Sequence, residues 1–337
     1  MVARNSKGDV TFYTCGRRAN EHTNLRHCRC FIHADQGNRC LRGKGYNVKF
    51  YMNFTDLDDH TIKGAEESGE SVADFTTRYV NPFKDDPQGL GVVRAAGYPQ
   101  ASAHVSRMIE MARELIKKGF AYEKHGSIYF DISRFAQYGR LSGVDLSMVQ
   151  SGKTVDLDNY EKDSPVDFTL LKRSTLTELK SGIFFETEWG KMRPGWHIEC
   201  AAMSCHFLGD TIDIHSSSRD LMFPHHENEI AQSEAATGEK FVNVWMHNGF
   251  VRIDDEKMSK SLGNFFTVRE ILARYAPEVI RYFVLSSHYR SPLNYSDVHL
   301  DQARAALEGF YTALRDLAPD LNVCGGDYDA RFMAAMA

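Results

Sequence analysis

Two lysines that flank a short hydroxyl-containing segment are the first residues whose spacing suggests chemistry. The segment comprises Lys257, Met258, Ser259, Lys260 and Ser261. A loop of this composition can place two ammonium groups on a phosphate chain, where they stabilise the negative charge that develops on a leaving pyrophosphate. The alternative is a solvated Lys/Ser loop, which is what most segments of this composition form.

A second set of residues has the types and spacing of a metal site. If residues 224–236 form a helix, His225 and Glu229 share one face of it, with Cβ atoms roughly 5–6 Å apart. Cys200 lies on the preceding expected helix, and Cys15 ends the first expected strand. Strand ends converge on the ligand crevice of a parallel sheet. The four residues would give zinc two thiolates, an imidazole and a carboxylate.

Spacing alone leaves a structural interpretation of these residues open. A buried cysteine usually fills space in a core, and a His/Glu pair on a helix is usually a surface or capping pair. Cys28 and Cys30 form a rival C-x-C donor pair without a near partner, whereas Cys40 and Cys205 are typical packing residues. Trp196, beside the expected metal helix, would either join the core or wall a small ligand pocket.

Length and composition are those of a soluble globular protein. The 337 residues suggest roughly two domains. The net charge of −5 excludes a polycationic nucleic-acid binder, so an RNA contact would need a local basic patch. No apolar run could span a bilayer, and the N-terminus lacks a signal-peptide segment. We therefore expect a cytoplasmic protein whose seven cysteines are free thiols or metal ligands rather than disulfides.

The expected elements alternate between strands and helices. Strands at 10–14 and 46–52 would join through a helix in a right-handed βαβ unit, although 29–41 has few apolar residues and is a poor helix by its pattern. Residues 82–99 are expected to be irregular, and 133–188 to hold short strands and loops. Further helices are expected at 56–79, 103–118, 196–208, 224–236, 267–286, 298–316 and 328–337, and further strands at 211–215, 241–246 and 249–253, with a hairpin at 122–132.

The chain closely resembles one family, the cysteinyl-tRNA synthetases of class I. The lysine segment matches the KMSKS signature of that class, and Pro-Gly-Trp-His-Ile-Glu-Cys at 194–200 matches the family. Further matching segments are 53–59, 213–215, 220–229, 257–264 and 288–296.

The resemblance implies an α/β fold with a Rossmann-like parallel-sheet catalytic domain, an inserted connective subdomain and a C-terminal helical segment. The two halves of the catalytic domain would be residues 1–120 and 193–266, with the zinc site and the KMSKS loop in the second half. The connective insertion would be 121–192. Residues 267–337 would form the helical stem segment, and the family's anticodon-binding region would be absent.

The resemblance also implies ATP-dependent activation of cysteine and its transfer to tRNA(Cys), with Mg²⁺ accompanying ATP and one Zn²⁺ per chain. It assigns zinc to Cys15, Cys200, His225 and Glu229. The substrate thiolate would bind zinc, which rejects serine more strongly than pocket shape alone, whose discrimination is only about a hundredfold. The remaining implied sites are Thr55, Trp196, His215 and Asp220 for cysteine, and His27, Lys257, Met258, Ser259, Lys260 and Ser261 for ATP, with His27, Lys257 and Lys260 catalytic.

Several positions depart from the family pattern. The HIGH motif at 24–27 reads Asn-Leu-Arg-His, and Arg26 replaces a glycine that lets adenine approach the backbone. Residues 17–21 replace a Pro-Thr-Val-Tyr-Asp run, and serines at 216–218 replace glycines. We therefore expect weakened ATP activation. We also expect a monomer. With its end at Ala337, the chain would contact the acceptor end of tRNA(Cys), with reduced tRNA choice.

Other functions compete with cysteine–tRNA ligation. One is a zinc-binding relative with little or no activity. Another is a cysteine ligase acting on a small amine, as in mycothiol biosynthesis, but residues 257–296 match the tRNA enzyme throughout. A purely structural zinc protein would leave the lysine segment unexplained.

Overall fold

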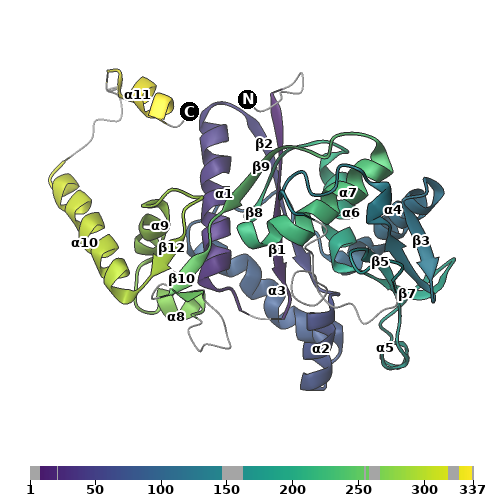
Figure 1. Ribbon diagram of the computed structural model, residues 1–337. Helices are drawn as coiled ribbons and strands as arrows, with labels where there is room; N and C mark the ends of the chain where they lie inside the picture. Colours follow the sequence, from purple (N-terminus) through teal and green to yellow (C-terminus); the bar gives the residue numbers. More distant parts are fainter. Residues whose placement is uncertain are drawn as a thin grey trace.

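A four-stranded parallel sheet forms the centre of the molecule. The computed structural model describes residues 8–20, 22–145, 162–253, 256–257, 266–317 and 326–335. The strand order is β2-β1-β8-β9, and every neighbouring pair is parallel (Figure 1). These strands are β1 (Asp9–Arg18), β2 (Asn47–Thr55), β8 (Ile212–Ser218) and β9 (Val242–Asn248). The expected α/β fold with a parallel sheet is confirmed.

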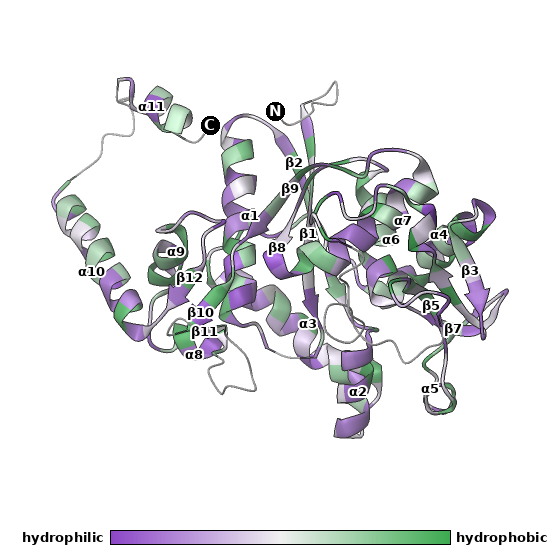
Figure 2. Ribbon diagram, in the orientation of Figure 1, coloured by the Kyte–Doolittle hydropathy of each residue, from purple (hydrophilic) through white to green (hydrophobic). Residues whose placement is uncertain are grey.

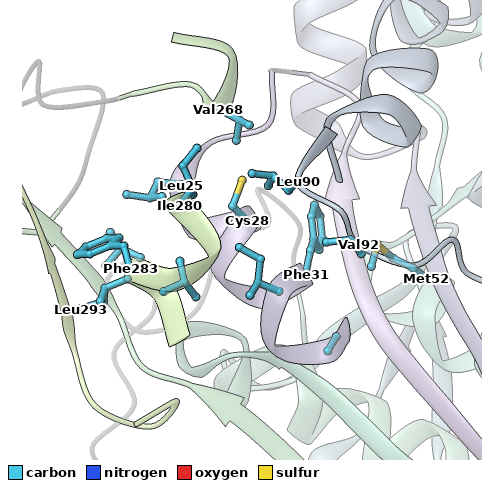
Figure 3. Close-up of a cluster of buried hydrophobic side chains, with 14 of the residues drawn as sticks. Leu25, Cys28, Phe31, Met52, Leu90, Val92, Val268, Ile280, Phe283 and Leu293 are labelled. Atoms are coloured by element: carbon cyan, nitrogen blue, oxygen red, sulfur yellow. The ribbon is translucent and has the colours of Figure 1, made fainter. Parts of the chain in front are cut away.

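Helix α1 (Leu25–Gly43) links β1 to β2, although its sequence has a poor helical pattern. It lies against one face of the sheet, with α6 and α7 on the other (Figure 1). Its residues alternate between hydrophilic and hydrophobic along its length (Figure 2). The apolar ones, including Leu25, Cys28 and Phe31, pack into the largest hydrophobic cluster (Figure 3).

Several polar residues of α1 are buried as well, and two of them, Arg29 and Asp35, find partners outside the helix. Arg29 is fully buried and reaches two loops far away in the sequence. Asp35, also fully buried, accepts hydrogen bonds from the Val93 amide at 2.8 Å and from the Arg281 guanidinium at 2.8 Å. Hydrophobic periodicity therefore fails as a guide to this helix, since polar side chains occupy part of its buried surface.

Two helices follow β2, and the second corrects an expectation. They are α2 (Asp59–Ser68) and α3 (Val72–Gly89). Residues 82–99 were expected to be irregular, but α3 continues through Pro82 and Pro87. Phe83 lies between these prolines and is fully buried against Phe31 and Phe54. This packing outweighs the helix hydrogen bonds that the prolines remove.

A second, antiparallel sheet of order β3-β4-β5-β7-β6 lies beside the central one. Its hairpin turns at His125 and Gly126, both with positive φ, as the sequence predicts. Helix α4 (Val105–Lys117) packs its apolar side into a separate cluster with this sheet. The strands are β3 (Ala121–Lys124), β4 (Ser127–Phe130), β5 (Phe168–Arg173), β6 (Phe185–Thr187) and β7 (Gly190–Pro194), accompanied by η1 (Ala101–His104), η2 (Ile132–Arg134) and α5 (Leu176–Lys180).

The chain then returns to the central sheet through α6 (Trp196–Leu208), which begins where the sequence predicts. The helix expected from Pro224 begins later. A 3-10 turn, η4 (Arg219–Leu221), leads into a wide π-type turn, η5 (Met222–His226), and α7 covers Glu227–Thr237.

The C-terminal part adds a three-stranded sheet and short helices. The sheet has the order β11-β10-β12, with β10 (Val251–Ile253), β11 (Glu256–Lys257) and β12 (Leu293–Tyr295). The single helix expected at 267–286 is two helices, α8 (Val268–Leu272) and α9 (Pro277–Leu285), because Pro277 starts the second. The last helices are α10 (Asp297–Leu314) and α11 (Tyr328–Ala335). None of the helices in the described segments combines the length and apolar character needed to cross a membrane.

Candidate active site

A cavity of about 460 Å³ opens at the carboxyl ends of the central strands. Its wall comes from the ends of β1, β2 and β8, the N-terminus of α1, the first turns of α6, and the turn before α7. Ligands of open α/β sheets bind at this edge of the sheet. The expected site residues on the wall are Cys15, His27, Thr55, Trp196, Cys200, Asp220 and His225.

Gly16 lets β1 approach β2 closely beside Cys15. A Cβ atom at this position would lie 1.6 Å from the backbone oxygen of Asn53. The Gly16 amide also donates a hydrogen bond of 2.8 Å to the side-chain oxygen of Asn53. This contact fixes the strand end that carries Cys15.

The four expected metal ligands meet on one side of the cavity. The sulfur of Cys15 lies 3.7 Å from that of Cys200, 3.5 Å from Nε2 of His225 and 3.4 Å from Oε1 of Glu229. Nε2 of His225 is 3.0 Å from the same Glu229 oxygen. All four ligand atoms lie within 4.8 Å of one another, and all four residues are buried. The cluster can therefore hold one metal ion.

A second donor group shares two members with the first. It comprises Cys15, His215, His226 and Glu229. Nδ1 of His226 lies 2.8 Å from Nε2 of His247, and its Nε2 lies 4.0 Å from Oε1 of Glu229. The first group has two sulfur donors and places Cys15, Cys200 and His225 on the cavity wall. Thiolate and imidazole donors in a four-residue set suit zinc.

Two groups of the cluster, Cys200 and Glu229, favour the negatively charged form that binds a metal. A hydrogen bond from the Cys15 thiol lowers the pKa of Cys200 to about 6 against the opposing effect of burial. Burial, and then Cys200, raise the pKa of Cys15 well above its ordinary value. Burial also opposes ionisation of Glu229, but His215 and His225 hold its pKa well below the ordinary value. A thiolate and a carboxylate are thus present to attract a cation.

Neighbouring side chains orient the ligands. Nδ1 of His225 lies 2.9 Å from Nδ1 of His197, which fixes the ring with Nε2 facing the other donors. The indole of Trp196 stacks on His225, with ring centroids 4.3 Å apart and an interplanar angle of 14°. Nε2 of His215 lies 3.1 Å from Oε2 of Glu229.

Comparison with known proteins gives the family. The catalytic-domain family described as tRNA synthetases class I (C) matches residues 1–305. A cysteine–tRNA ligase from Cupriavidus necator is 48% identical over 98% of this chain and 71% of its own length. One from Thioalkalivibrio sulfidiphilus is 49% identical, with the same coverage. The chain belongs to the cysteine–tRNA ligase family.

Solved structures of other class I synthetases share the fold. Methionyl-tRNA synthetase from Mycobacterium tuberculosis, in complex with methionyl-adenylate, has a TM-score of 0.67 at 15% identity, covering 91% of this chain and 69% of its own. A leucyl-tRNA synthetase from Agrobacterium radiobacter, in a ternary complex, has a TM-score of 0.67 at 10% identity, covering 93% and 73%. At these identities the likeness concerns the fold alone.

The residues at the family's HIGH position cap α1 at the cavity. The Asn24 side chain accepts hydrogen bonds from the amides of Arg26 (3.0 Å) and His27 (3.3 Å), and Nδ1 of His27 accepts one from the Asn24 amide (3.3 Å). This capping box explains why the helix starts here despite its weak pattern. Arg26 and His27 both line the cavity.

Two of the expected cysteine-site residues, Asp220 and His215, differ in their access to the cavity. Asp220 lies on the cavity wall. Burial, and to a lesser extent the charge of Asp220, raise the pKa of Cys30 to about 12. His215 is fully buried next to the donor cluster, with Nε2 3.9 Å from the sulfur of Cys15. It therefore contacts the ligands rather than the cavity wall.

The lysine segment of this cysteine–tRNA ligase relative is described only at its start. Lys257 ends β11, where its backbone pairs with that of Arg252. The other predicted ATP-site residues in the segment, Met258, Ser259, Lys260 and Ser261, lie outside the described residues.

Sequence reasoning missed several side chains at the site. His197 and Asn53 lie in segments that match the family, so the resemblance was a signal that could have singled them out. Arg18 lies in a segment that departs from the family, and no sequence signal pointed to its position on the cavity wall.

Proposed function

We propose that this chain activates cysteine with ATP and transfers it to tRNA(Cys). The observation that carries the proposal is the four-donor cluster at the cavity, with Cys15, Cys200 and His225 on the cavity wall. A metal held there would face whatever occupies the cavity, at the edge of the sheet where class I synthetases bind their ligands.

The cluster fits zinc, which would be held by Cys15, Cys200, His225 and Glu229. Its two sulfur donors, its burial and its lowered Cys200 pKa match the preferences of this ion. When bound, zinc would take the thiolate of cysteine and discriminate it from the neutral hydroxyl of serine.

The residues of the chain would then position the reacting groups. Trp196, stacked on His225, would wall the amino-acid side of the cavity together with Thr55. His27, at the N-terminus of α1, would face the phosphates of ATP, which are stabilised at a helix N-terminus. We assign phosphate binding to Lys257 and Lys260 as well, on the resemblance alone. The cysteine carboxylate attacks the α-phosphate of ATP and pyrophosphate leaves. The terminal hydroxyl of the tRNA then attacks the carbonyl carbon of the adenylate, and AMP leaves.

One feature favours weak activation. Arg26 lines the cavity at the position where the family has glycine, and its Nε is buried without a hydrogen-bond partner among the described residues. An arginine here occupies space that adenine would need. We therefore assign the chain a raised KM for ATP.

The test is cysteine-dependent exchange between ATP and pyrophosphate with zinc at one equivalent. Exchange with cysteine but not with serine supports the proposal. Zinc content is measured in parallel for Cys200→Ser and for the matched control Cys205→Ser, which changes the same residue type on the same helix. Cys205 contacts Ser233 instead of the cluster.

The two variants should differ in zinc affinity. Because even the partners of metal ligands matter 10- to 100-fold, Cys200→Ser should weaken zinc binding by more than about 100-fold. Cys205→Ser should keep one zinc per chain. Equal zinc content in both variants would refute the proposal. Exchange between ATP and pyrophosphate that is equally fast with cysteine and with serine at millimolar ATP would also refute it.

A further inference from the structure

Arg18, at the end of β1, lies on the amino-acid side of the cavity. Its guanidinium carbon is 4.1 Å from the ring centroid of Trp196. Trp196 in turn stacks on the proposed metal ligand His225 at 4.3 Å. Arg18 is also register partner to Thr55 across the β1–β2 pair. Trp196 therefore contacts both the charge of Arg18 and His225 of the donor cluster.

A buried acid fixes the orientation of the Arg18 side chain. Nε of Arg18 pairs with Oδ2 of Asp58 at 2.9 Å, and the Asp58 side chain is only 2% exposed. The other oxygen of Asp58 accepts hydrogen bonds from the amide and the hydroxyl of Thr61, at 3.0 and 2.5 Å. Asp58 thus forms an ion pair with Nε of the guanidinium, whose two terminal nitrogens are further hydrogen-bond donors.

The Arg18 side chain is 29% exposed. Arg18 lines the main cavity and also an adjoining cavity of about 290 Å³. In the part of the chain that the structure describes, Asp58 is the acid paired with Arg18. The neighbouring carboxylate of Asp59 is taken up by Lys172, at 2.6 Å, and by Arg193. An oriented guanidinium with free donors is a binding site for a planar anion.

We propose that Arg18 binds the α-carboxylate of the amino-acid substrate. The inference rests on the proposed function, since it takes the thiolate of cysteine to lie at the donor cluster. The carboxyl carbon of cysteine is three bonds from its sulfur, which matches a cation placed beside Trp196 rather than beside the cluster itself. A carboxylate accepts two parallel hydrogen bonds from a guanidinium, and this pairing would hold the attacking oxygen in place.

The position of Arg18 argues against a role with ATP. Arg26 and His27 lie at the N-terminus of α1 and face the cavity from there. Arg18 instead contacts Trp196 and Asp58, which belong to the amino-acid side. The two sets of cations thus serve different parts of the cavity.

The test compares cysteine with cysteamine, which keeps the thiol and the amine but lacks the carboxylate. Calorimetry on the zinc-loaded protein measures the affinity for each ligand. Variants are Arg18→Thr, which introduces the family's residue, Arg18→Lys, which keeps the charge, and the control Arg113→Thr, an exposed arginine paired with Glu188. Zinc content and thermal midpoint are recorded for each.

Loss of a charge-assisted, bidentate contact should weaken cysteine binding by about 10- to 100-fold in Arg18→Thr. Cysteamine affinity should stay within about twofold of wild type, and Arg18→Lys should lie between. Arg113→Thr should bind both ligands as wild type does.

Three outcomes would overturn the inference. Equal losses for both ligands would mean that Arg18 only supports Trp196. Unchanged cysteine affinity with weaker ATP binding would place it on the nucleotide. Equal affinities of the wild-type protein for cysteine and cysteamine would refute the carboxylate contact without any variant. The proposed function would not be affected by that result. Failure to bind either thiol would instead refute the proposed function itself.

Discussion

Replacing Arg29 by methionine should reduce the free energy of unfolding by about 3–5 kcal/mol. Arg29 is fully buried in α1, and its pKa is lowered by burial to about 10, so it is a cation at neutral pH. Methionine has similar length and no charge. The change therefore removes the donors while leaving most of the packing volume.

The magnitude follows from the carbonyl groups that Arg29 joins. One terminal nitrogen donates to the backbone oxygens of Gly249 and Phe250 at 3.0 and 2.9 Å. The other donates to those of Ser291 and Tyr289 at 2.5 and 3.1 Å, with a longer contact to His288. Each buried carbonyl that loses its partner costs about 1–3 kcal/mol, and partial relaxation of the two loops should lower the total.

Urea titration followed by circular dichroism measures the change. The matched control is Arg39→Met, ten residues along the same helix, where the arginine side chain is 48% exposed. Without Arg39, the buried Asp35 carboxylate keeps its contacts with Val93 and Arg281, so this variant should lose less stability than Arg29→Met. If the two variants unfold at the same urea concentration, the carbonyl contacts of Arg29 do not stabilise the fold as argued.

Two further predictions concern the cavity and pH. Arg26→Gly should lower the KM for ATP in pyrophosphate exchange, with Arg26→Ala between it and wild type. A KM that rises instead would mean that Arg26 binds phosphate. Burial, then Arg29 and His288, lower the pKa of His33 to about 4. Because only the unfolded chain binds this proton between pH 6.5 and 4, wild type should lose stability relative to His33→Asn on acidification. In denaturant titrations, the difference in free energy of unfolding between wild type and His33→Asn should change by about 1.4 kcal/mol per pH unit in this window. A difference independent of pH would contradict this pKa.

The donor cluster was within reach of sequence reasoning because its members are tied to local geometry. His225 and Glu229 are four residues apart, one in the turn before α7 and the other in its first turn, and Cys15 lies in the carboxyl-terminal half of β1. Parallel strands bring such ends together at one edge. The wide turn Met222–His226 was not foreseen, yet it continues directly into α7 and keeps the pair on one side.

Helix α1 shows what the sequence could not give. Two of its buried polar residues, Arg29 and Asp35, find partners more than 50 positions away, as Asp35 does with Val93 and Arg281. No local pattern reports such contacts, and the helical period of apolar residues is diluted by the polar side chains that they bury. The same limitation explains the continuation of α3 through its prolines, where Phe83 packs on α1 and β2.

Arginines in the N-terminal segment therefore divide into two functions that composition cannot separate. Arg29 donates to buried carbonyls of the scaffold, whereas Arg18 and Arg26 line the cavity, where we expect them to change what it can bind. A substitution at Arg29 should alter stability while leaving the ratio of cysteine to cysteamine affinity unchanged. A substitution at Arg18 should do the opposite. If both variants altered the same quantity, the division between scaffold and ligand contact along this segment would be wrong, and the altered positions would be better explained by one common packing change.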